Sequence, residues 1–416
     1  MRSIVLVSFL LVPAAAAQQA RYDLLLKGGH VIDAKSNIDA VRDVAILDGR
    51  IARVAVQIDS AEARKVVDVS GLYVTPGLID MHVHVFKRND PPITMNEEAV
   101  QPDAFSFRSG VTTMVDAGSS GWKEFPEFRD RVIKKAKTRV LAFLNIVGAG
   151  MGTGHENEAA EMDAEAAARC AKENPGIIVG FKSAHYAGPG WPSIENAVKA
   201  GNLAGLPVMV DFGQITSDRN IETLFMDKLR PGDIFTHCFS GHREEVLESG
   251  KLNPAMVEGR KRGIIFDIGF GQASFYWYVA LPAYQAGFYP DSISTDLHTN
   301  SMNGGMKNID NVMADLMGLG SSFADVIRMA TWAPAKEIKR PGLGNLDVGA
   351  EADVAVFRLE TGRYGLLDSA GARMVGTRRI LCELTLRKGV VSWDLNGVAS
   401  EDWKAFQYKK GPFFKK

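Results

Sequence analysis

Apolar runs alternate with helix-like stretches through the middle of the chain. Eight runs can be counted, at 75–86, 111–116, 139–147, 177–183, 207–211, 233–237, 263–267 and 292–296. The segments between them carry apolar residues at helical spacing, most clearly in 158–173, 194–204, 253–262 and 306–319. Apolar runs of this kind are typical of parallel strands that are buried on both faces. Eight strand–helix units predict an α/β fold, a (β/α)8 TIM barrel over residues 75–339.

The two flanks of this region show a different pattern, with short strand-like runs separated by turns. Before the region lie 22–26, 30–32, 43–47, 51–56 and 65–69, and after it lie 352–357, 379–386 and 390–393. Asp48 and Gly49 stand between two of these runs, which is a strong signal for a β-hairpin. We therefore expect residues 18–74 and 340–416 to build one small, discontinuous β-sandwich domain.

The first residues differ from the rest of the chain. Arg2 supplies a positive charge, residues 4–12 form a short apolar run, and residues 15–17 match a small-residue cleavage pattern. This combination is typical of a secretory signal peptide, and the run is shorter than the roughly 20 apolar residues that span a bilayer. We expect residues 1–17 to be a signal peptide cleaved near Ala17, and the mature protein to be periplasmic or secreted.

Composition narrows the class of partner. The 416 residues are 46% hydrophobic, enough for a large core, and 48 basic residues stand against 49 acidic ones, for a net charge of −1. No overall field favours nucleic acid or an anionic membrane, so we expect neither as a partner. A small-molecule substrate is the expected partner, and a homo-oligomer remains open. The three cysteines are too few for a disulfide framework and are expected to be small buried residues.

The run 75–86 ends in a pair of histidines two residues apart. Side chains at positions i and i+2 of a strand point to the same face, so His82 and His84 are expected to converge. Neutral imidazole is the commonest nitrogen ligand of zinc-like ions. The pair therefore predicts half of a metal site at the end of a buried strand.

Polar residues also end the later runs, where a barrel places its active site. They are Asp116, Lys182, Asp211, His237, Asp267 and Asp296. Most of these are metal-ligand types, which predicts a metal site shared between strand ends. Asp116 and Asp267 are expected to act as hydrogen-bond acceptors at their strand ends.

Four segments together resemble a known superfamily. They read Pro-Gly-Leu-Ile-Asp-Met-His-Val-His at 76–84, Val-Gly-Phe-Lys-Ser at 179–183, Thr-His-Cys-Phe-Ser-Gly at 236–241 and Ser-Thr-Asp-Leu-His at 294–298. In this order they are similar to the amidohydrolase superfamily, and within it to the amidohydrolase/deacetylase group of metallo-dependent hydrolases. The resemblance implies two divalent metal ions, most simply zinc. It also implies these ligands: His82, His84, Lys182 as a carbamate formed with carbon dioxide, His237 and Asp296.

Asp211 departs from this pattern, because many relatives carry histidine there. Two divalent ions would be balanced by the carbamate, Asp211, Asp296 and a bridging hydroxide, so the site would be neutral. We therefore expect Asp211 to be a ligand of a more oxygen-loving second ion, manganese or iron beside zinc. Two alternatives stay open: His185 takes the missing place, or the second site is empty.

The predicted chemistry is hydrolysis of the amide bond of an N-acylated amino acid or similar small molecule. A metal-activated hydroxide attacks the carbonyl, and Asp296, the expected catalytic residue, passes the proton to the leaving nitrogen. An esterase or a cyclic-amide hydrolase is the alternative, since the same hydroxide attacks either carbonyl. A metal-poor small-molecule binding protein is the non-enzymatic alternative, and Asp211 leaves room for it.

Four further residues are candidates for substrate binding, each with a plainer structural interpretation. His298 shares the face of Asp296, and His185 and Tyr186 follow Lys182, where packing would also explain them. His155 ends a glycine-rich stretch that lacks the features of a phosphate-binding loop. We expect that stretch to be an active-site loop that closes over substrate.

Overall fold

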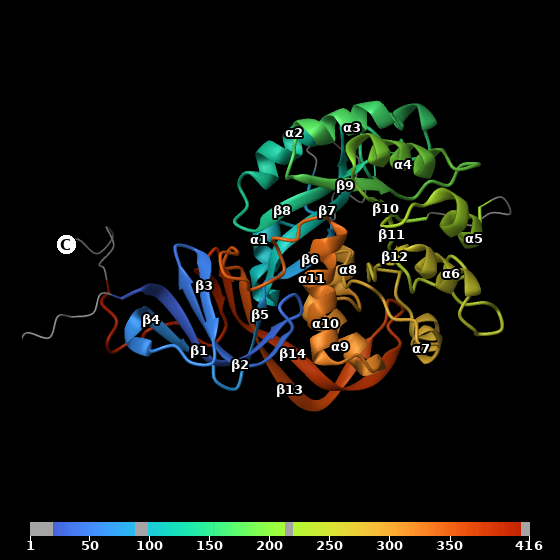
Figure 1. The fold of residues 1–416 in the computed structure, drawn as a ribbon. Helices are drawn as coiled ribbons and strands as arrows, with labels where there is room; N and C mark the ends of the chain where they lie inside the picture. The colour runs from blue at the N-terminus through green and yellow to red at the C-terminus, as the bar shows by residue number, and fades with distance from the viewer. Residues whose placement is uncertain (1–19, 88–98, 153, 213–218, 409–416) are drawn as a thin grey trace, which may run out of the picture.

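The computed structural model describes residues 20–87, 99–152, 154–212 and 219–408. Two sheets dominate it: a parallel sheet in the middle of the chain and a mixed sheet made from both flanks (Figure 1). The predicted signal peptide, residues 1–17, lies outside the described residues. The fold is thus α/β, as the sequence pattern predicted.

The parallel sheet has seven strands, which lie side by side in the order of the chain. They are β6 (Leu78–Val83), β7 (Val111–Gly121), β8 (Arg139–Asn145), β9 (Ile178–Ser183), β10 (Val208–Val210), β11 (Ile234–Phe235) and β12 (Ile265–Phe266). Each lies within or across one of the first seven predicted runs. The sheet curls, with helices outside it. Because its strands are parallel, all their carboxyl ends lie on one side.

The eighth predicted run, 292–296, does not form a strand in this sheet. It makes isolated parallel bridges between Asp267 and Ser292 and between Val83 and Leu297. The segment therefore lies between β12 and β6, the two edges of the sheet. Asp296 has a left-handed backbone (φ 51°), which interrupts the extended conformation that a continuous ladder requires. The seven strands of the described chain therefore curl without closing into a regular barrel.

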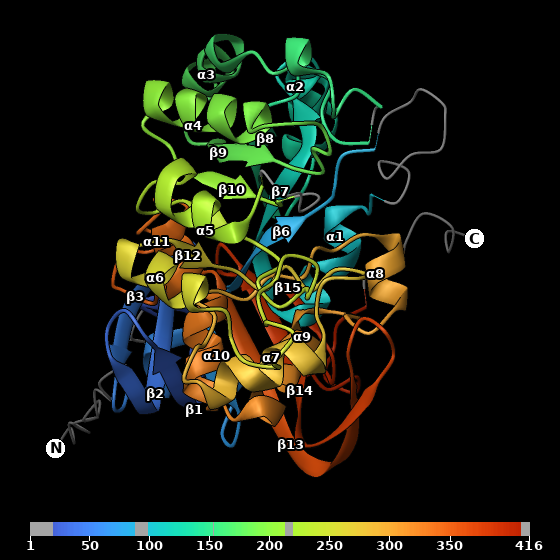
Figure 2. The same ribbon diagram turned by 90° about the vertical axis from the view of Figure 1, so that its right-hand side faces the viewer.

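Helices cover the outside of the curled sheet, as Figures 1 and 2 show for α2 to α4 over β7 to β9. They are α1 (Pro102–Phe105), α2 (Phe125–Phe128), α3 (Ala164–Glu173), α4 (Pro192–Ala204), α5 (Ile221–Thr223), α6 (Pro254–Arg262), α7 (Trp277–Gln285), α8 (Thr299–Asn303), α9 (Ile309–Leu319), α10 (Phe323–Ala330) and α11 (Trp332–Glu337). α3 begins later than predicted because Asp163 caps it by accepting from Ala166 N. Within the described ranges, no helix has the length and apolar character needed to cross a bilayer.

The flanks form one mixed sheet of eight strands. These are β1 (Tyr22–Asp33), β2 (Ile38–Leu47), β3 (Arg50–Ala55), β4 (Ala63–Asp68), β5 (Tyr73–Pro76), β13 (Val354–Leu367), β14 (Arg373–Arg387) and β15 (Val390–Asp394). The antiparallel pairing of β5 with β13 joins the two flanks. Asp48 and Gly49 turn between β2 and β3 with positive φ at both residues, the conformation of a tight hairpin turn.

The two flanks form one hydrogen-bonded sheet, whereas the predicted β-sandwich would have two stacked sheets. Its far edge returns to the segment before β13: Ile51 N donates to Ala350 O at 2.9 Å, and Arg50 bridges Glu351. The sheet therefore wraps around its own apolar core, to which β1, β2, β3, β5, β13 and β14 all contribute. The prediction of a β-sandwich is therefore corrected: the flanks form a single wrapped sheet, because its edge strand β3 bonds to the segment that leads into β13.

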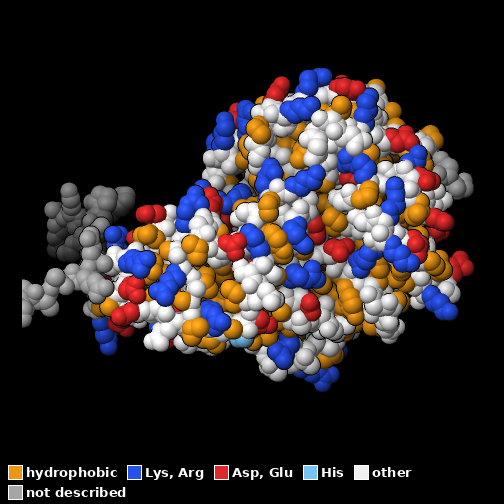
Figure 3. Space-filling view, viewed as in Figure 1, with side chains coloured by type: hydrophobic (Ala, Val, Ile, Leu, Met, Phe, Trp, Pro, Cys, Tyr) orange, Lys and Arg blue, Asp and Glu red, His pale blue; other side chains and the backbone are white. Residues whose placement is uncertain are grey.

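The charges on the face seen in Figure 3 are mixed, and the cysteines are unpaired. Basic and acidic side chains are interspersed over the face seen in Figure 3. All three cysteines are unpaired: Cys238 and Cys382 are buried and Cys170 is half-buried. They behave as small packing residues, as predicted.

A partly buried ion-pair cluster fastens the mixed sheet to the parallel sheet. Arg139 at the start of β8 donates to Thr113 Oγ1 and Asp353 Oδ2, both at 2.7 Å, and pairs with Glu351. Arg387 also reaches Asp353 Oδ1 at 2.9 Å. Two arginines thus neutralise two carboxylates where the domains meet.

Replacing Arg139 tests this connection. We expect Arg139→Met to lower the free energy of unfolding by about 2 kcal/mol, less than for a fully isolated buried charge because Arg387 remains as a partner. Urea denaturation followed by tryptophan fluorescence measures it. Lys134→Met is the control, because the pair of Lys134 with Asp130 is exposed to solvent and is expected to contribute little to stability. Equal losses of stability in the two variants would contradict the role of Arg139 in joining the two sheets.

Candidate metal centre

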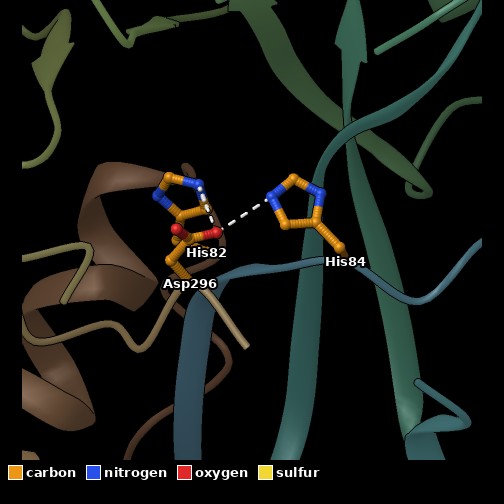
Figure 4. A group of neighbouring side chains, drawn as sticks. All are labelled: His82, His84 and Asp296. Carbon is orange, nitrogen blue, oxygen red and sulfur yellow. Dashed lines mark ion pairs between the residues drawn. The ribbon is translucent and has the colours of Figure 1, made fainter. Parts of the chain in front are cut away.

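His82, His84 and Asp296 converge in the interior, with both imidazoles turned toward the carboxylate (Figure 4). Asp296 Oδ1 lies 3.5 Å from His82 Nε2 and 3.0 Å from His84 Nε2. One ligand atom from each residue lies within 4.8 Å of the other two, and all three residues are buried. Two imidazole nitrogens and a carboxylate oxygen at this spacing suit a divalent ion of the zinc type. The part of the chain that the structure describes contains no second trio of this kind.

Backbone hydrogen bonds bring the three residues together from the two edges of the sheet. His84 N donates to Leu297 O at 2.9 Å, and Leu297 N donates to His82 O at 3.3 Å. These bonds hold the segment that carries Asp296 against the end of β6. The left-handed backbone of Asp296 breaks the strand at the residue whose carboxylate the site uses.

A hydrogen-bond chain fixes the ring of His82. Thr236 Oγ1 donates to Asp267 Oδ2 at 2.7 Å and lies 2.9 Å from His82 Nδ1. A hydroxyl has one proton to donate, so His82 must donate from Nδ1, which leaves its Nε2 lone pair facing the centre. Burial and the neighbouring Lys182 hold the pKa of His82 well below its usual range, so the ring is neutral.

His84 is supported in a similar way from β7. Its Nδ1 lies 2.9 Å from Ser119 Oγ. Asp116 accepts from Ser119 N and from Val85 N, both at 2.8 Å. Asp116 and Asp267 are therefore the strand-end acceptors that were expected, and each supports one imidazole through a hydroxyl residue. Supports of this kind orient the ligands of metal sites.

Lys182 lies on β9 directly beside this trio and is fully buried. Its Nζ is 3.1 Å from His82 Nε2 and 3.7 Å from Met209 Sδ. Burial lowers the pKa of Lys182, although Asp211 and Asp296 act in the opposite direction. Gly118 makes room for it, because a Cβ there would lie 2.8 Å from Lys182 Cβ.

Asp211 lies at the centre of a second cluster. Its Oδ2 is 3.0 Å from His185 Nε2 and 3.4 Å from His237 Nε2, while its Oδ1 pairs with Arg243. Burial alone would raise the pKa of Asp211, but Arg243, His237 and His185 together hold it well below the usual range. Burial likewise opposes the charge on His185, yet Asp211 and Glu156 raise its pKa to about 10.

Arg243 is the site residue that the sequence analysis missed. Its side chain is 7% exposed and also donates from Nη1 to Ser240 Oγ at 3.0 Å. It follows the 236–241 motif by two residues, in the loop after β11. An arginine so close to a predicted ligand motif was the available signal, but the spacing alone could not show that it folds back onto Asp211.

The candidates for substrate binding divide into two groups. His298 is buried beside the metal trio, with Nδ1 2.7 Å from Asp296 O and 3.6 Å from Asp296 Oδ1. His185 joins the Asp211 cluster. Tyr186 instead points its hydroxyl at Pro189 O, 2.9 Å away, and packs its ring under Arg219.

His155 lies outside both clusters. Its side chain is 48% exposed and Nδ1 is 3.0 Å from Glu158 Oε1. The structure therefore brings the six predicted metal-ligand residues together in two adjoining clusters. His185 and His298 lie beside these residues, whereas His155 and the Tyr186 hydroxyl lie apart from them.

Comparison with known proteins places the chain in a family. No protein-family model matches it. It is 31% identical over 333 residues to a deacetylase of Agrobacterium fabrum, covering 78% of this chain and 80% of that protein. Its fold matches the crystal structure of an adenine deaminase (TM-score 0.81, 28% identity, 90% of this chain and 100% of that one) and that of a dihydroorotase (TM-score 0.76, 28% identity, 88% and 98%). The chain belongs to the amidohydrolase superfamily, metal-dependent hydrolases that act on carbon–nitrogen bonds other than peptide bonds.

Proposed function

We propose that the protein hydrolyses the amide bond of an N-acylated amino acid or a similar small molecule. The observation that carries this proposal is the convergence of His82, His84 and Asp296 on one point, with both imidazole Nδ1 atoms engaged elsewhere. The deacetylase name of the relative supports an acylated substrate. The balanced charge of the chain supports a small molecule as partner.

The residues present fit one divalent ion, for which zinc is the simplest choice. His82, His84 and Asp296 would hold it, with Lys182 beside them. When bound, such an ion lowers the pKa of water and polarises the substrate carbonyl. The hydroxyls of Thr236 and Ser119 keep the two rings in place before the ion arrives, which limits the reorganisation that binding requires.

Lys182 is proposed to carry a carbamate. Its burial favours the neutral amine, whose lone pair can attack carbon dioxide. A nitrogen–carbon bond forms, one carbon–oxygen π pair moves onto oxygen, and the nitrogen loses a proton to solvent. The product is an anionic oxygen ligand in place of a cation, next to His82.

Asp296 is proposed to move the proton. Burial would raise the pKa of Asp296, but His82, His298 and His84 hold it well below the usual range, so it is ionised at neutral pH. Oδ1 faces the two imidazoles, and Oδ2 faces Gly271, where a Cβ would lie 2.6 Å away. Oδ2 therefore accepts the proton from water and returns it to the leaving nitrogen. His298 holds the backbone carbonyl of Asp296, with its Nδ1 2.7 Å from Asp296 O.

We propose two further features, which concern the fold of the central region and the location of the protein. Segment 292–297 takes the place that the eighth strand has in a (β/α)8 barrel, although it forms no continuous strand; its isolated bridges to both edges of the sheet support this. The protein is exported and acts in the periplasm or outside the cell, supported by the charged and apolar pattern of residues 1–17.

A mixed substrate panel tests the function. N-acyl-D- and N-acyl-L-amino acids, dipeptides, acetyl esters and cyclic amides are offered to zinc-loaded protein, with metal-depleted protein as the matched control. We expect hydrolysis of N-acyl amino acids that is lost on depletion and restored by zinc. Preference for esters or cyclic amides would favour the corresponding hydrolase, and ligand binding without hydrolysis in any metal state would indicate a binding protein.

Thr236 tests the support of His82. Thr236→Val removes the hydroxyl that links His82 Nδ1 to Asp267, and we expect zinc affinity to fall by about 10- to 100-fold. Thr236→Ser keeps the hydroxyl and should restore most of the affinity. Competition with a chelator measures both. Wild-type affinity in the valine variant would show that the hydrogen-bond chain does not position the ring.

Asp296 tests the proton step. Asp296→Asn cannot accept the proton, so we expect kcat to fall by about 10²- to 10⁴-fold in protein that still holds zinc. Steady-state kinetics and metal analysis are performed on the same sample. Asp39→Asn, at an exposed aspartate of β2, is the matched control and should leave kcat unchanged. Retention of more than a few per cent of kcat with zinc bound would contradict this role.

A further inference from the structure

The two clusters of the site differ in the partner of their carboxylate. Asp296 meets only imidazoles, those of His82, His84 and His298, whereas Asp211 meets two imidazoles and also a buried arginine. Building on the proposed function, we infer that the guanidinium of Arg243 replaces a second metal ion, so that the chain binds one divalent ion and uses Arg243 as its second cation. A two-metal centre, which the sequence motifs imply, therefore does not fit these residues.

Both oxygens of Asp211 are already engaged. Oδ1 pairs with Arg243 Nη2, and Oδ2 lies 3.0 Å from His185 Nε2 and 3.4 Å from His237 Nε2. The side chains of Asp211 and Arg243 are 4% and 7% exposed, so water cannot readily take the place of either partner. To bind an ion, Asp211 would have to leave a buried arginine without its carboxylate, which is costly for a charge that cannot be lost.

The histidine and carboxylate atoms of the second cluster are also spaced more widely than those of the first. Ligands of a zinc-type ion lie about 2.0 to 2.2 Å from it, so any two of them are within roughly 4.4 Å of each other. His82, His84 and Asp296 come near this limit, with ligand atoms within 4.8 Å of one another. His185, Asp211 and His237 do not meet even the 4.8 Å spacing as a trio within the described ranges.

The loop after β11 is built to hold Arg243 in place. Its Nη1 donates to Ser240 Oγ at 3.0 Å, and its backbone N donates to Glu245 Oε2 at 3.0 Å. Glu245 is fully buried and also accepts from Ser240 Oγ at 2.5 Å. Ser240 therefore holds the guanidinium, and Glu245 the backbone, of Arg243 in addition to the pair with Asp211.

The charges of the two clusters also favour one divalent ion over two. Asp296 and a carbamate on Lys182 would together neutralise one divalent ion. Arg243 already neutralises Asp211 in the adjoining cluster. A second divalent ion would bring two positive charges next to a fixed guanidinium, in a region where burial makes unpaired charge unfavourable. An aspartate at position 211 thus matches an arginine, which a histidine would not.

Metal stoichiometry tests the inference. Protein incubated with excess zinc and bicarbonate and then dialysed is analysed by inductively coupled plasma mass spectrometry. We expect one zinc per wild-type chain and two per chain in Arg243→Gln, where Asp211 is released. Arg243→Lys keeps the positive charge and should stay at one. Arg358→Gln, which breaks the pair of Arg358 with buried Glu383 in the mixed sheet, is the matched control and should also stay at one.

A second variant keeps the test decisive if Arg243→Gln does not fold. Asp211→Asn should leave one zinc per chain, whereas it would reduce two to one if Asp211 were a ligand. Two zinc ions per wild-type chain with hydrolysis would overturn this inference alone, as would one zinc in both the wild type and a folded Arg243→Gln. No bound zinc and no hydrolysis would overturn the proposed function and this inference with it.

Discussion

The contact between the Asp296 carboxylate and the imidazoles of His82 and His84 is the interaction on which the site depends. It joins the two edges of the curled sheet, because Asp296 lies on the segment after β12 and the histidines end β6. Buried polar groups of this kind are stable only when each has a partner. The hydroxyls of Thr236 and Ser119 and the carboxylates behind them meet that requirement on the far side of each ring.

The two clusters show how one scaffold can carry two kinds of positive charge. Around Asp296 the partners are imidazoles, which leaves a place for a divalent ion. Around Asp211 the positive charge is covalently part of the chain, chiefly as Arg243, with the imidazole of His185 beside it. A fixed guanidinium needs no metal supply and cannot be lost by chelation, but it is not a Lewis acid in the sense of a metal ion. Chemistry at the carbonyl would therefore depend mainly on the first cluster.

Much of the fold could be predicted because the signals were local. Apolar runs marked seven strands, and Asp48–Gly49 marked a hairpin. The eighth run failed as a strand because the left-handed backbone at Asp296 is a tertiary feature. The wrapped sheet could not be predicted, since the contact of Ile51 with Ala350 joins residues far apart in sequence. Arg243 was missed for the same reason: its partner Asp211 follows β10, far from Arg243 in the sequence.

Anomalous X-ray diffraction at the zinc edge, from crystals grown with zinc and bicarbonate, locates the bound ions. We expect one strong anomalous peak within coordination distance of His82 Nε2, His84 Nε2 and Asp296 Oδ1. Arg243 should remain paired with Asp211 in the same crystals. A peak coordinated by Asp211, or the absence of any peak between His82, His84 and Asp296, would contradict this expectation.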